Sequence, residues 1–551
     1  MPVRSFLPAF LALLLALPLT ANDLVYRQLQ SGRSNGPATI HEHGLFGEGE
    51  IIAILDTGLD YDSCYFAEPD GSPPPVNLSL PGGVLQRANV DHRRRKVIAY
   101  NFLYSCAGNP GSPGCEDPSD PRAYDNQGHG THAAAVAAGD RGQPLIHDPA
   151  DSIAPGAQLV IQDAGFIGGD DCTQRPGLGC PLRDLGPVLE QAYEQGSRIH
   201  SNSWGDRQGT PQPLTPPTAN YSKAAGEIDA FVHEHQDMLV IFNTGNAGQL
   251  GSSSVSAPGV AKNAIQVGGV ISFEGEQAVA SFSGRGPTRD GRIKPDLVAP
   301  ATITAGDSDF DVTSGSCDVS RQTGTSWSAP AVAGAAALIR DYFASGFYPG
   351  GFRSSGPPMR ASAALVKAVL IASARSVAWD ATTGRLIPSG AVPSFQQGFG
   401  MPALDDALHF AGQPRKLLVL DLQSDRGLAA GDGMSIRLLV RAGTPLRVVL
   451  VWTDPPAEPR GPSDPAPVLV NDLDLSILTP DGRRLLGNDT ADSAARDQVN
   501  NVEAVLIHEP VQGDYVISIS GEHLALGARQ GYSLVVTGDM VLTARSRPAR
   551  R

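Results

Sequence analysis

The chain has 551 residues and a formal net charge of −15, with 42 Lys and Arg against 57 Asp and Glu. This acidic balance argues against nucleic acid or an anionic membrane surface as a partner, and the single basic run, His92 to Lys96, is expected to be a solvated turn. The length exceeds one ordinary core, and the 62 Gly and 45 Pro predict a turn-rich globular protein with two domains.

Residues 1–21, MPVRSFLPAFLALLLALPLTA, have the pattern of a secretory signal peptide. A cation at Arg4 precedes an apolar stretch from Phe6 to Leu17, and the small residues Thr20-Ala21 end the segment. The apolar stretch is too short to span a bilayer, and no later run approaches the roughly 18 apolar residues that a membrane helix needs. We therefore expect a secreted protein, extracellular or periplasmic, that is soluble, monomeric and not inserted in a membrane.

Export changes the interpretation of the six cysteines, because an oxidising compartment favours disulfides over free thiols or zinc ligands. Cys106 and Cys115 bracket one Gly/Pro-rich loop, and Cys172 and Cys180 bracket another. These positions predict two local bridges, which leave Cys64 to pair with Cys317. Other pairings remain open, because spacing alone does not select among them.

Residues 40–375 alternate between apolar, strand-like runs and helical stretches. The strand-like runs lie at 50–58, 157–165, 198–205 and 238–246, and a helical stretch lies at 221–237. Continuous apolar strands separated by helices predict a parallel sheet covered on both faces, which is an α/β fold. Such sheets place their active sites at the carboxyl ends of the strands.

After about residue 412 the pattern changes to seven or eight short strands without helices, from KLLVLDLQ to YSLVVTG. Short strands broken by Gly, Pro and Asp predict an antiparallel sandwich or jelly roll. The expected organisation is therefore a signal peptide at 1–21, an α/β domain at 22–411, an all-β domain at 412–541 and a disordered tail at 542–551.

Three residues supply the groups that nucleophilic catalysis by serine requires. Asp56 ends the first strand in AILDTGLD, His129 opens the helical stretch GHGTHAAAVAAG, and Ser326 stands at the start of the helix SWSAPAVAGAAALIRDYF. A serine nucleophile needs a base to accept its proton and an acid to orient that base. We expect Ser326 both to cap its helix and to act as a nucleophile, because a helix start exposes its hydroxyl.

The stretches DTGLD, GHGTHAAAVAAG, FNTGNAG, SFSGRGPT, KPDLVAP and GTSWSAP, in this order, resemble the subtilisin-like serine proteases. VLVWTDPP and LVNDLDLSILTP further resemble the subgroup with a C-terminal jelly-roll domain. The resemblance implies that Ser326 is the nucleophile, His129 the general base and Asp56 its orienting acid. It also implies that Asn246 and the backbone N–H of Ser326 stabilise the oxyanion.

The resemblance also indicates where a peptide substrate would bind. Ser203-Trp204-Gly205 resembles the strand that pairs with the substrate backbone and forms one wall of the primary pocket. Asn243-Thr244-Gly245 resembles the opposite wall. A protein or peptide substrate would then add as an antiparallel strand. Neither wall carries a carboxylate, so we expect a neutral or apolar residue before the cut.

Two features depart from the family pattern. About 27 residues separate the signal peptide from the first strand, too few for a folded inhibitory prosegment. Trp327 also follows the nucleophile where the family more often has Met, a difference that repacking can accommodate. Two functional alternatives remain: an acyl transferase or ligase that uses the same acyl-enzyme, and a catalytically idle binding module.

The chemistry requires no cofactor, but calcium bound for structural reasons is possible. The acidic clusters Asp170-Asp171, Asp472-Asp474 and Asp489 to Asp497 offer oxygen ligands, yet none has EF-hand spacing, and a solvated surface is the favoured interpretation of each. His129 and His132 lie three residues apart on a predicted helix, but no HExxH motif accompanies them. We expect His132 to be structural.

Overall fold

The structure is a computed structural model, and it describes residues 25–108, 115–125, 127–142, 151–164, 184–205, 219–273, 276–387, 392–489 and 495–546. The predicted signal peptide, Asp170-Asp171 and the predicted Cys172–Cys180 bridge lie outside the described residues. The other two predicted disulfides, Cys64–Cys317 and Cys106–Cys115, are formed. No helix in the described ranges is both long and apolar enough to span a bilayer.

A largely parallel sheet forms the centre of the N-terminal part, as the apolar runs predicted. Its strand order is β14-β13-β9-β8-β7-β6-β1-β5-β4-β2-β3, with β10 paired to β8. The parallel strands are β1 (Ile51–Asp56), β2 (Val76–Leu80), β4 (Val97–Phe102), β5 (Gln158–Asp163), β6 (Ile199–Asn202), β7 (Leu239–Asn243), β8 (Ile265–Phe273) and β10 (Leu297–Pro300). Short strands extend its edges: β3 (Val84–Leu85), β9 (Glu276–Val279), β13 (Trp379–Asp380) and β14 (Arg385–Leu386).

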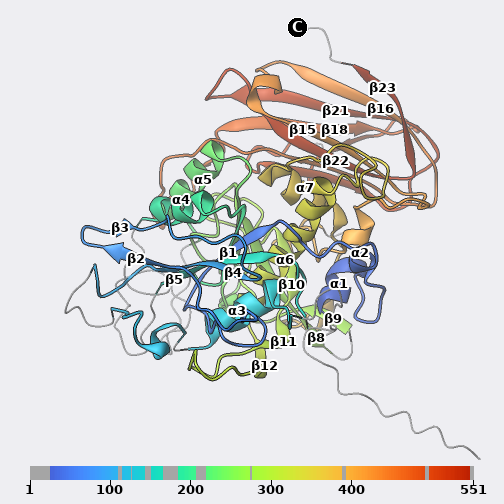
Figure 1. Ribbon diagram of the computed structural model, residues 1–551. Coiled ribbons are helices and arrows are strands. Elements are labelled where there is room, and N and C mark those ends of the chain that lie inside the picture. The colour runs from blue at the N-terminus through green and yellow to red at the C-terminus, as the bar shows by residue number, and fades with distance from the viewer. Residues whose placement is uncertain are drawn as a thin grey trace, which may run out of the picture.

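Helices cover both faces of this sheet (Figure 1). One pair packs together on one face: α3 (His129–Ala138) and the long α6 (Thr325–Ala344). A second pair packs together elsewhere on the sheet: α4 (Gly186–Glu194) and α5 (Lys223–Glu234). A hairpin of β11 (Thr302–Gly306) and β12 (Val319–Thr323) leads directly into α6.

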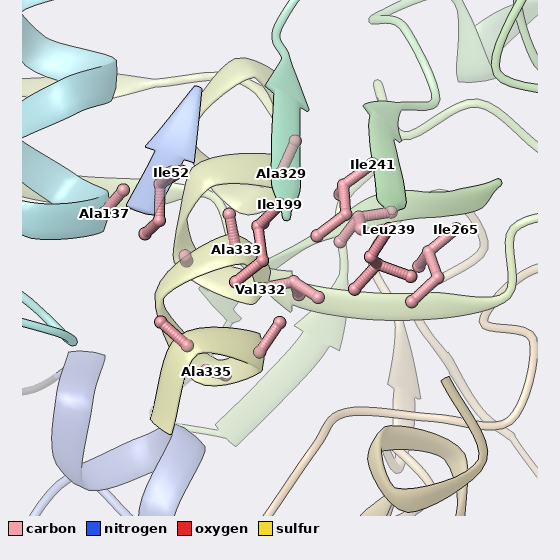
Figure 2. Packing of buried hydrophobic residues seen from close by; sticks show 14 of the residues in the cluster. Ile52, Ala137, Ile199, Leu239, Ile241, Ile265, Ala329, Val332, Ala333 and Ala335 are labelled. Carbon is pink, nitrogen blue, oxygen red and sulfur yellow. The ribbon is translucent and has the colours of Figure 1, made fainter. Parts of the chain in front are cut away.

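Small residues let α6 approach the sheet and α3 closely. Figure 2 shows Ala329, Val332 and Ala333 of α6 packed among apolar side chains of the parallel strands, such as Ile199 and Leu239. Any Cβ at Gly334 would lie 2.8 Å from the carbonyl oxygen of Ala137 in α3. The Ala- and Gly-rich sequence of α6 therefore fixes its distance from the helix that carries His129.

The segment before the first strand is integrated into the core. Helices α1 (Val25–Ser31) and α2 (Thr39–Glu42) precede β1, and Tyr26, Leu29 and Ile40 are buried. The side-chain oxygen of Gln30 accepts hydrogen bonds from the backbone N–H groups of Ile40 and His41 at 2.9 and 3.2 Å. This segment, which is too short for a folded prosegment, is thus part of the fold.

Two sheets form the C-terminal part, as the short strands predicted. One has the order β15-β22-β17-β20 and the other β19-β18-β21-β16-β23. The strands are β15 (Lys416–Leu422), β16 (Gly433–Val440), β17 (Leu446–Val451), β18 (Asn471–Leu478), β19 (Arg484–Leu486), β20 (Val502–Ile507), β21 (Gly513–Leu524), β22 (Tyr532–Gly538) and β23 (Met540–Ser546). Apolar side chains from both sheets share one core, so the two sheets form a sandwich.

The four-stranded sheet is buried on both faces. One face contributes to the core of the sandwich, whereas Leu417, Val449 and Val535 on the other belong to the core of the N-terminal part. Helix α7 (Ala363–Ser373) packs on β17 and β22, and it lies between the two parts in Figure 1. The end of the sandwich differs from expectation, because β23 pairs with β16 as far as Ser546, and the disordered tail predicted from residue 542 is wrong for residues 542–546.

Candidate active site

The carboxyl ends of three adjacent parallel strands meet at one edge of the sheet. Strand β1 lies between β5 and β6, and β6 pairs with β7. Asp56 is the last residue of β1, Ser203 follows β6, and Asn243 is the last residue of β7. Chain segments far apart in the sequence therefore bring their polar residues to the edge where such sheets place their sites.

Asp56 and His129 form a hydrogen-bonded pair at this edge. The distance between Asp56 Oδ1 and His129 Nδ1 is 2.6 Å. The carboxylate side chain is 1% exposed, whereas the imidazole is 27% exposed. The carboxylate therefore selects the tautomer in which Nδ1 carries the proton, and Nε2 is left as the basic nitrogen.

The surroundings of His129 shift its pKa in two opposing directions. Burial disfavours the imidazolium, but the carboxylates of Asp56 and Asp125 favour it. The net effect is a pKa raised above the usual 6.5. A base with a raised pKa holds an accepted proton more readily once it has taken it.

Asp125 organises the loop that leads into α3, and it was not among the site residues expected from the sequence. Its side chain is buried and accepts five hydrogen bonds, of 2.6 to 3.1 Å, from Thr57 Oγ1, Gln127 N, Gly128 N, and Thr131 N and Oγ1. Because Thr57 follows Asp56, this carboxylate connects the end of β1 to the start of α3. The sequence signal for it was the placement of an acidic residue four positions before His129.

Backbone contact between α3 and the turn after β1 is equally close. Any Cβ at Gly130 would lie 2.1 Å from the carbonyl oxygen of Gly58, so only glycine fits there. The backbone N–H of Gly130 also donates to Thr57 Oγ1 at 2.8 Å. These contacts hold the imidazole against the carboxylate of Asp56.

Ser326 is the second residue of α6, and it does not cap the helix. The N-cap is Gly324, which has no side chain to make a capping hydrogen bond, so the expectation that Ser326 caps α6 is wrong. The Ser326 hydroxyl instead donates to the carbonyl oxygen of Ser203 at 3.4 Å, and Ser203 Oγ donates to the Ser326 carbonyl oxygen at 2.6 Å. These hydrogen bonds place the start of α6 against the end of β6.

Trp327 connects the start of α6 to the imidazole of His129. Its ring centroid lies 4.7 Å from that of His129 and 4.4 Å from that of His132. The indole is buried, so the core accommodates the larger side chain that the sequence places after Ser326. Burial lowers the pKa of His132 to about 3, so His132 is a neutral, structural residue.

Asn246 lies beside the first turn of α6. Its Oδ1 accepts hydrogen bonds from the backbone N–H and the hydroxyl of Thr325, both at 3.0 Å. This use of the oxygen fixes the orientation of the amide and directs Nδ2, a hydrogen-bond donor, away from Thr325. Asn246 is an exposed residue at the edge of the site.

The residues expected to form the pocket walls lie at the ends of β6 and β7. All six are buried, and the Trp204 ring packs edge-on against Phe242 at 5.1 Å. Residues 206–218, which follow the first wall, lie outside the described residues. The two segments are thus brought together as neighbouring strand ends, and their binding role remains a prediction.

The acidic clusters provide limited support for a metal ion. Within the part of the chain that the structure describes, no three His, Cys, Asp or Glu side chains are grouped in a way that suits a metal. Asp474 instead pairs with Arg496 at 2.7 Å. Part of the cluster from Asp489 to Asp497 lies outside the described residues, so structural calcium remains an expectation.

Several known proteins are similar in sequence to this chain. The model of the Subtilase family matches residues 47–400. The serine protease/ABC transporter B family protein tagD of Dictyostelium discoideum is 25% identical over 90% of this chain and 32% of its own length, so the chain spans about a third of that relative. The subtilisin-like protease PopC of Myxococcus xanthus is 27% identical over 55% of this chain and 54% of its own length.

Solved structures also match. The S41 psychrophilic protease is 21% identical, with a TM-score of 0.41, over 65% of this chain and 91% of its own. A serine protease of Aeromonas sobria is 16% identical, with a TM-score of 0.39, over 94% of both chains.

Proposed function

Because the chain belongs to the subtilase family, we propose that it is a secreted serine endopeptidase that cleaves internal peptide bonds through an acyl-enzyme on Ser326. The observation that carries the proposal is the hydrogen bond between Asp56 and His129 Nδ1 at the strand edge where α6 begins. A base oriented in this way can accept the proton of a serine hydroxyl.

The proposed reaction begins when the Ser326 hydroxyl rotates from the Ser203 carbonyl toward His129 Nε2. His129 accepts the proton as Ser326 Oγ bonds to the scissile carbonyl carbon. The tetrahedral intermediate then collapses, and His129 returns the proton to the departing amine. Water, activated by the same imidazole, releases the acyl group and regenerates the serine.

Asn246 Nδ2 and the backbone N–H of Ser326 stabilise the negative charge on the carbonyl oxygen in this proposal. The support for the role of Asn246 is that Thr325 engages its oxygen, which leaves the amide donor free. Loss of one such donor costs about 2.7–4 kcal/mol of transition-state stabilisation, a magnitude that comes from subtilisin itself.

Labelling and proteolysis together test the function. The purified protein is incubated with a fluorophosphonate and, separately, with casein. We expect covalent labelling of Ser326 and new peptide termini, both lost in Ser326→Ala. Labelling without proteolysis would instead support the acyl-transferase alternative, and the absence of both would support a binding module.

Asn246→Ala tests the oxyanion role. We expect kcat to fall by roughly 100- to 1,000-fold with a much smaller change in KM. Asn89→Ala, which alters another exposed asparagine, serves as the control. A raised KM with unchanged kcat would remove Asn246 from this role.

A further inference from the structure

The loop between β11 and β12, residues 307–318, presents an aromatic side chain to solvent. Phe310 is 50% exposed. Its backbone has φ +68, in the left-handed region that residues other than glycine rarely adopt. The strained backbone conformation costs stability, and such strain concentrates at functional sites.

This loop, which we call the Phe310 loop, is anchored to the turn that follows Asp56. The disulfide between Cys64 and Cys317 closes its end. Two carboxylates of the turn hold its backbone and side chains: Asp60 Oδ2 accepts from Ser308 Oγ at 3.1 Å and from Asp309 N at 3.2 Å, and Asp62 Oδ2 accepts from Gly315 N at 2.8 Å. Phe310 N also donates to Ser308 Oγ at 2.9 Å. The loop is therefore a fixed part of the site's surroundings.

The Phe310 ring lies beside the residue that precedes His129. If Gly128 carried a Cβ, that atom would lie 3.6 and 3.8 Å from two carbons of the Phe310 ring and 3.1 Å from the Asp307 carboxylate. Gly128 has no side chain, so it leaves this side of the ring uncovered. An aromatic surface and a carboxylate therefore lie beside the residue that precedes His129 in the chain.

The Phe310 loop and the expected primary pocket lie on different sides of His129. The pocket walls follow β6 and β7, on one side of β1 in the sheet order. The loop instead contacts the turn after β1, and its hairpin strand β11 packs against α3. A substrate whose residue before the cut fills the pocket would pass the imidazole and reach the loop with the residue after the cut.

We propose that Phe310 is a specificity-determining residue on the leaving-group side of the cleft, where it receives a bulky apolar side chain of the residue that follows the scissile bond. The inference rests on the proposed endopeptidase function. Asp307 beside the ring disfavours an acidic residue at the same position, because two carboxylates would be brought close together.

Partition of the acyl-enzyme isolates the leaving-group side of the cleft. An ester substrate forms the acyl-enzyme, and leucine amide, glycine amide or glutamate amide then competes with water for it. The ratio of amide product to acid product reports nucleophile binding alone, whereas ester consumption reports acylation. Phe310→Ala should lower this ratio about tenfold for leucine amide, leave it unchanged for glycine amide, and leave ester consumption unchanged.

Three further variants sharpen the test. Phe352→Ala removes another exposed ring, 57% exposed, and should change none of the ratios. Phe310→Gly, which suits the φ of +68, should reproduce Phe310→Ala and show that the loop conformation is not the cause. Asp307→Asn should raise the ratio for glutamate amide severalfold.

An unchanged leucine amide ratio in both Phe310 variants overturns the proposal. The proposal is also overturned if the Phe310 variants change only the rates for esters that differ in the residue before the cut, because that result would place the ring on the acyl side. Failure of the wild-type protein to react with the fluorophosphonate is a separate outcome, which overturns the proposed function and this inference with it.

Discussion

A fully buried ion pair joins the two parts of the molecule, and its removal should be costly. Lys262 and Asp454 are both 0% exposed. Lys262 Nζ donates to Asp454 Oδ2 at 2.5 Å, to the Pro455 carbonyl oxygen at 2.6 Å and to the Val468 carbonyl oxygen at 2.8 Å. Lys262→Met leaves a buried carboxylate without its cation, which should lower the free energy of unfolding by about 3–5 kcal/mol.

The pH dependence of this loss identifies its cause. Burial raises the pKa of Asp454 even in the presence of Lys262, so removal of the cation should raise it further. A carboxyl whose pKa is higher in the folded than in the unfolded protein binds its proton more tightly when folded, so falling pH stabilises the folded variant. Below the pKa of Asp454 in the variant, the difference in unfolding free energy between Lys262→Met and wild type should shrink by up to about 1.4 kcal/mol per pH unit.

Urea unfolding, followed by the fluorescence of the four tryptophans in the Ser326→Ala background to prevent autolysis, measures the loss at about pH 8 and about pH 5. Lys223→Met is the control, because Lys223 is 69% exposed and pairs with Glu227 at the surface. It should cost at most about 1 kcal/mol. Equal losses in the two variants, or a loss in Lys262→Met that does not change with pH, would refute the burial argument.

Three further predictions concern the candidate site. Because the pKa of His129 is raised above 6.5 and the proposed base must be neutral, kcat/KM should fall as pH decreases through a value above 6.5; an acid limb below 6.5 would contradict the assignment. Asp125→Asn turns an amide NH₂ toward groups that are themselves donors, so kcat/KM should fall roughly 10- to 100-fold. It also removes one anion near His129, so the acid limb of the pH profile should move to lower pH. Asp120→Asn, the control, should change neither quantity. Replacing Cys64 and Cys317 together by Ala should lower the unfolding free energy in urea by about 2–5 kcal/mol and weaken the preference for leucine amide. If that preference is retained, the disulfide does not support the Phe310 subsite.

Periodic apolar patterns predicted the elements that carry the candidate residues. The runs at 50–58 and 238–246 contain β1 and β7, and the helical stretch at 221–237 contains α5. Because parallel strands align their carboxyl ends, the meeting of Asp56 with the other strand ends followed from the strands themselves. The approach of His129 to Asp56 required the motif resemblance, since no local pattern specifies a contact between residues so far apart.

Irregular segments were beyond the reach of such patterns. Lys96, in the basic run expected to be solvated, is 1% exposed, and its Nζ donates to the carbonyl oxygens of Pro155 and Ala157 at 2.8 and 2.5 Å. A lysine can be buried when carbonyl groups replace its water, and only the tertiary fold decides whether they do. Asp125 and the Phe310 loop could not be predicted for the same reason, because their roles depend on partners that are distant in the sequence.

The position of α7 determines when the protein can complete its fold. This helix at Ala363–Ser373 packs against β22 at Tyr532–Gly538, which is among the last strands of the chain. During synthesis, this apolar surface of α7 therefore stays exposed until β22 has emerged. The core around α7 is therefore complete only when β22 is present, and a chain shortened before Tyr532 would leave the apolar surface of α7 uncovered.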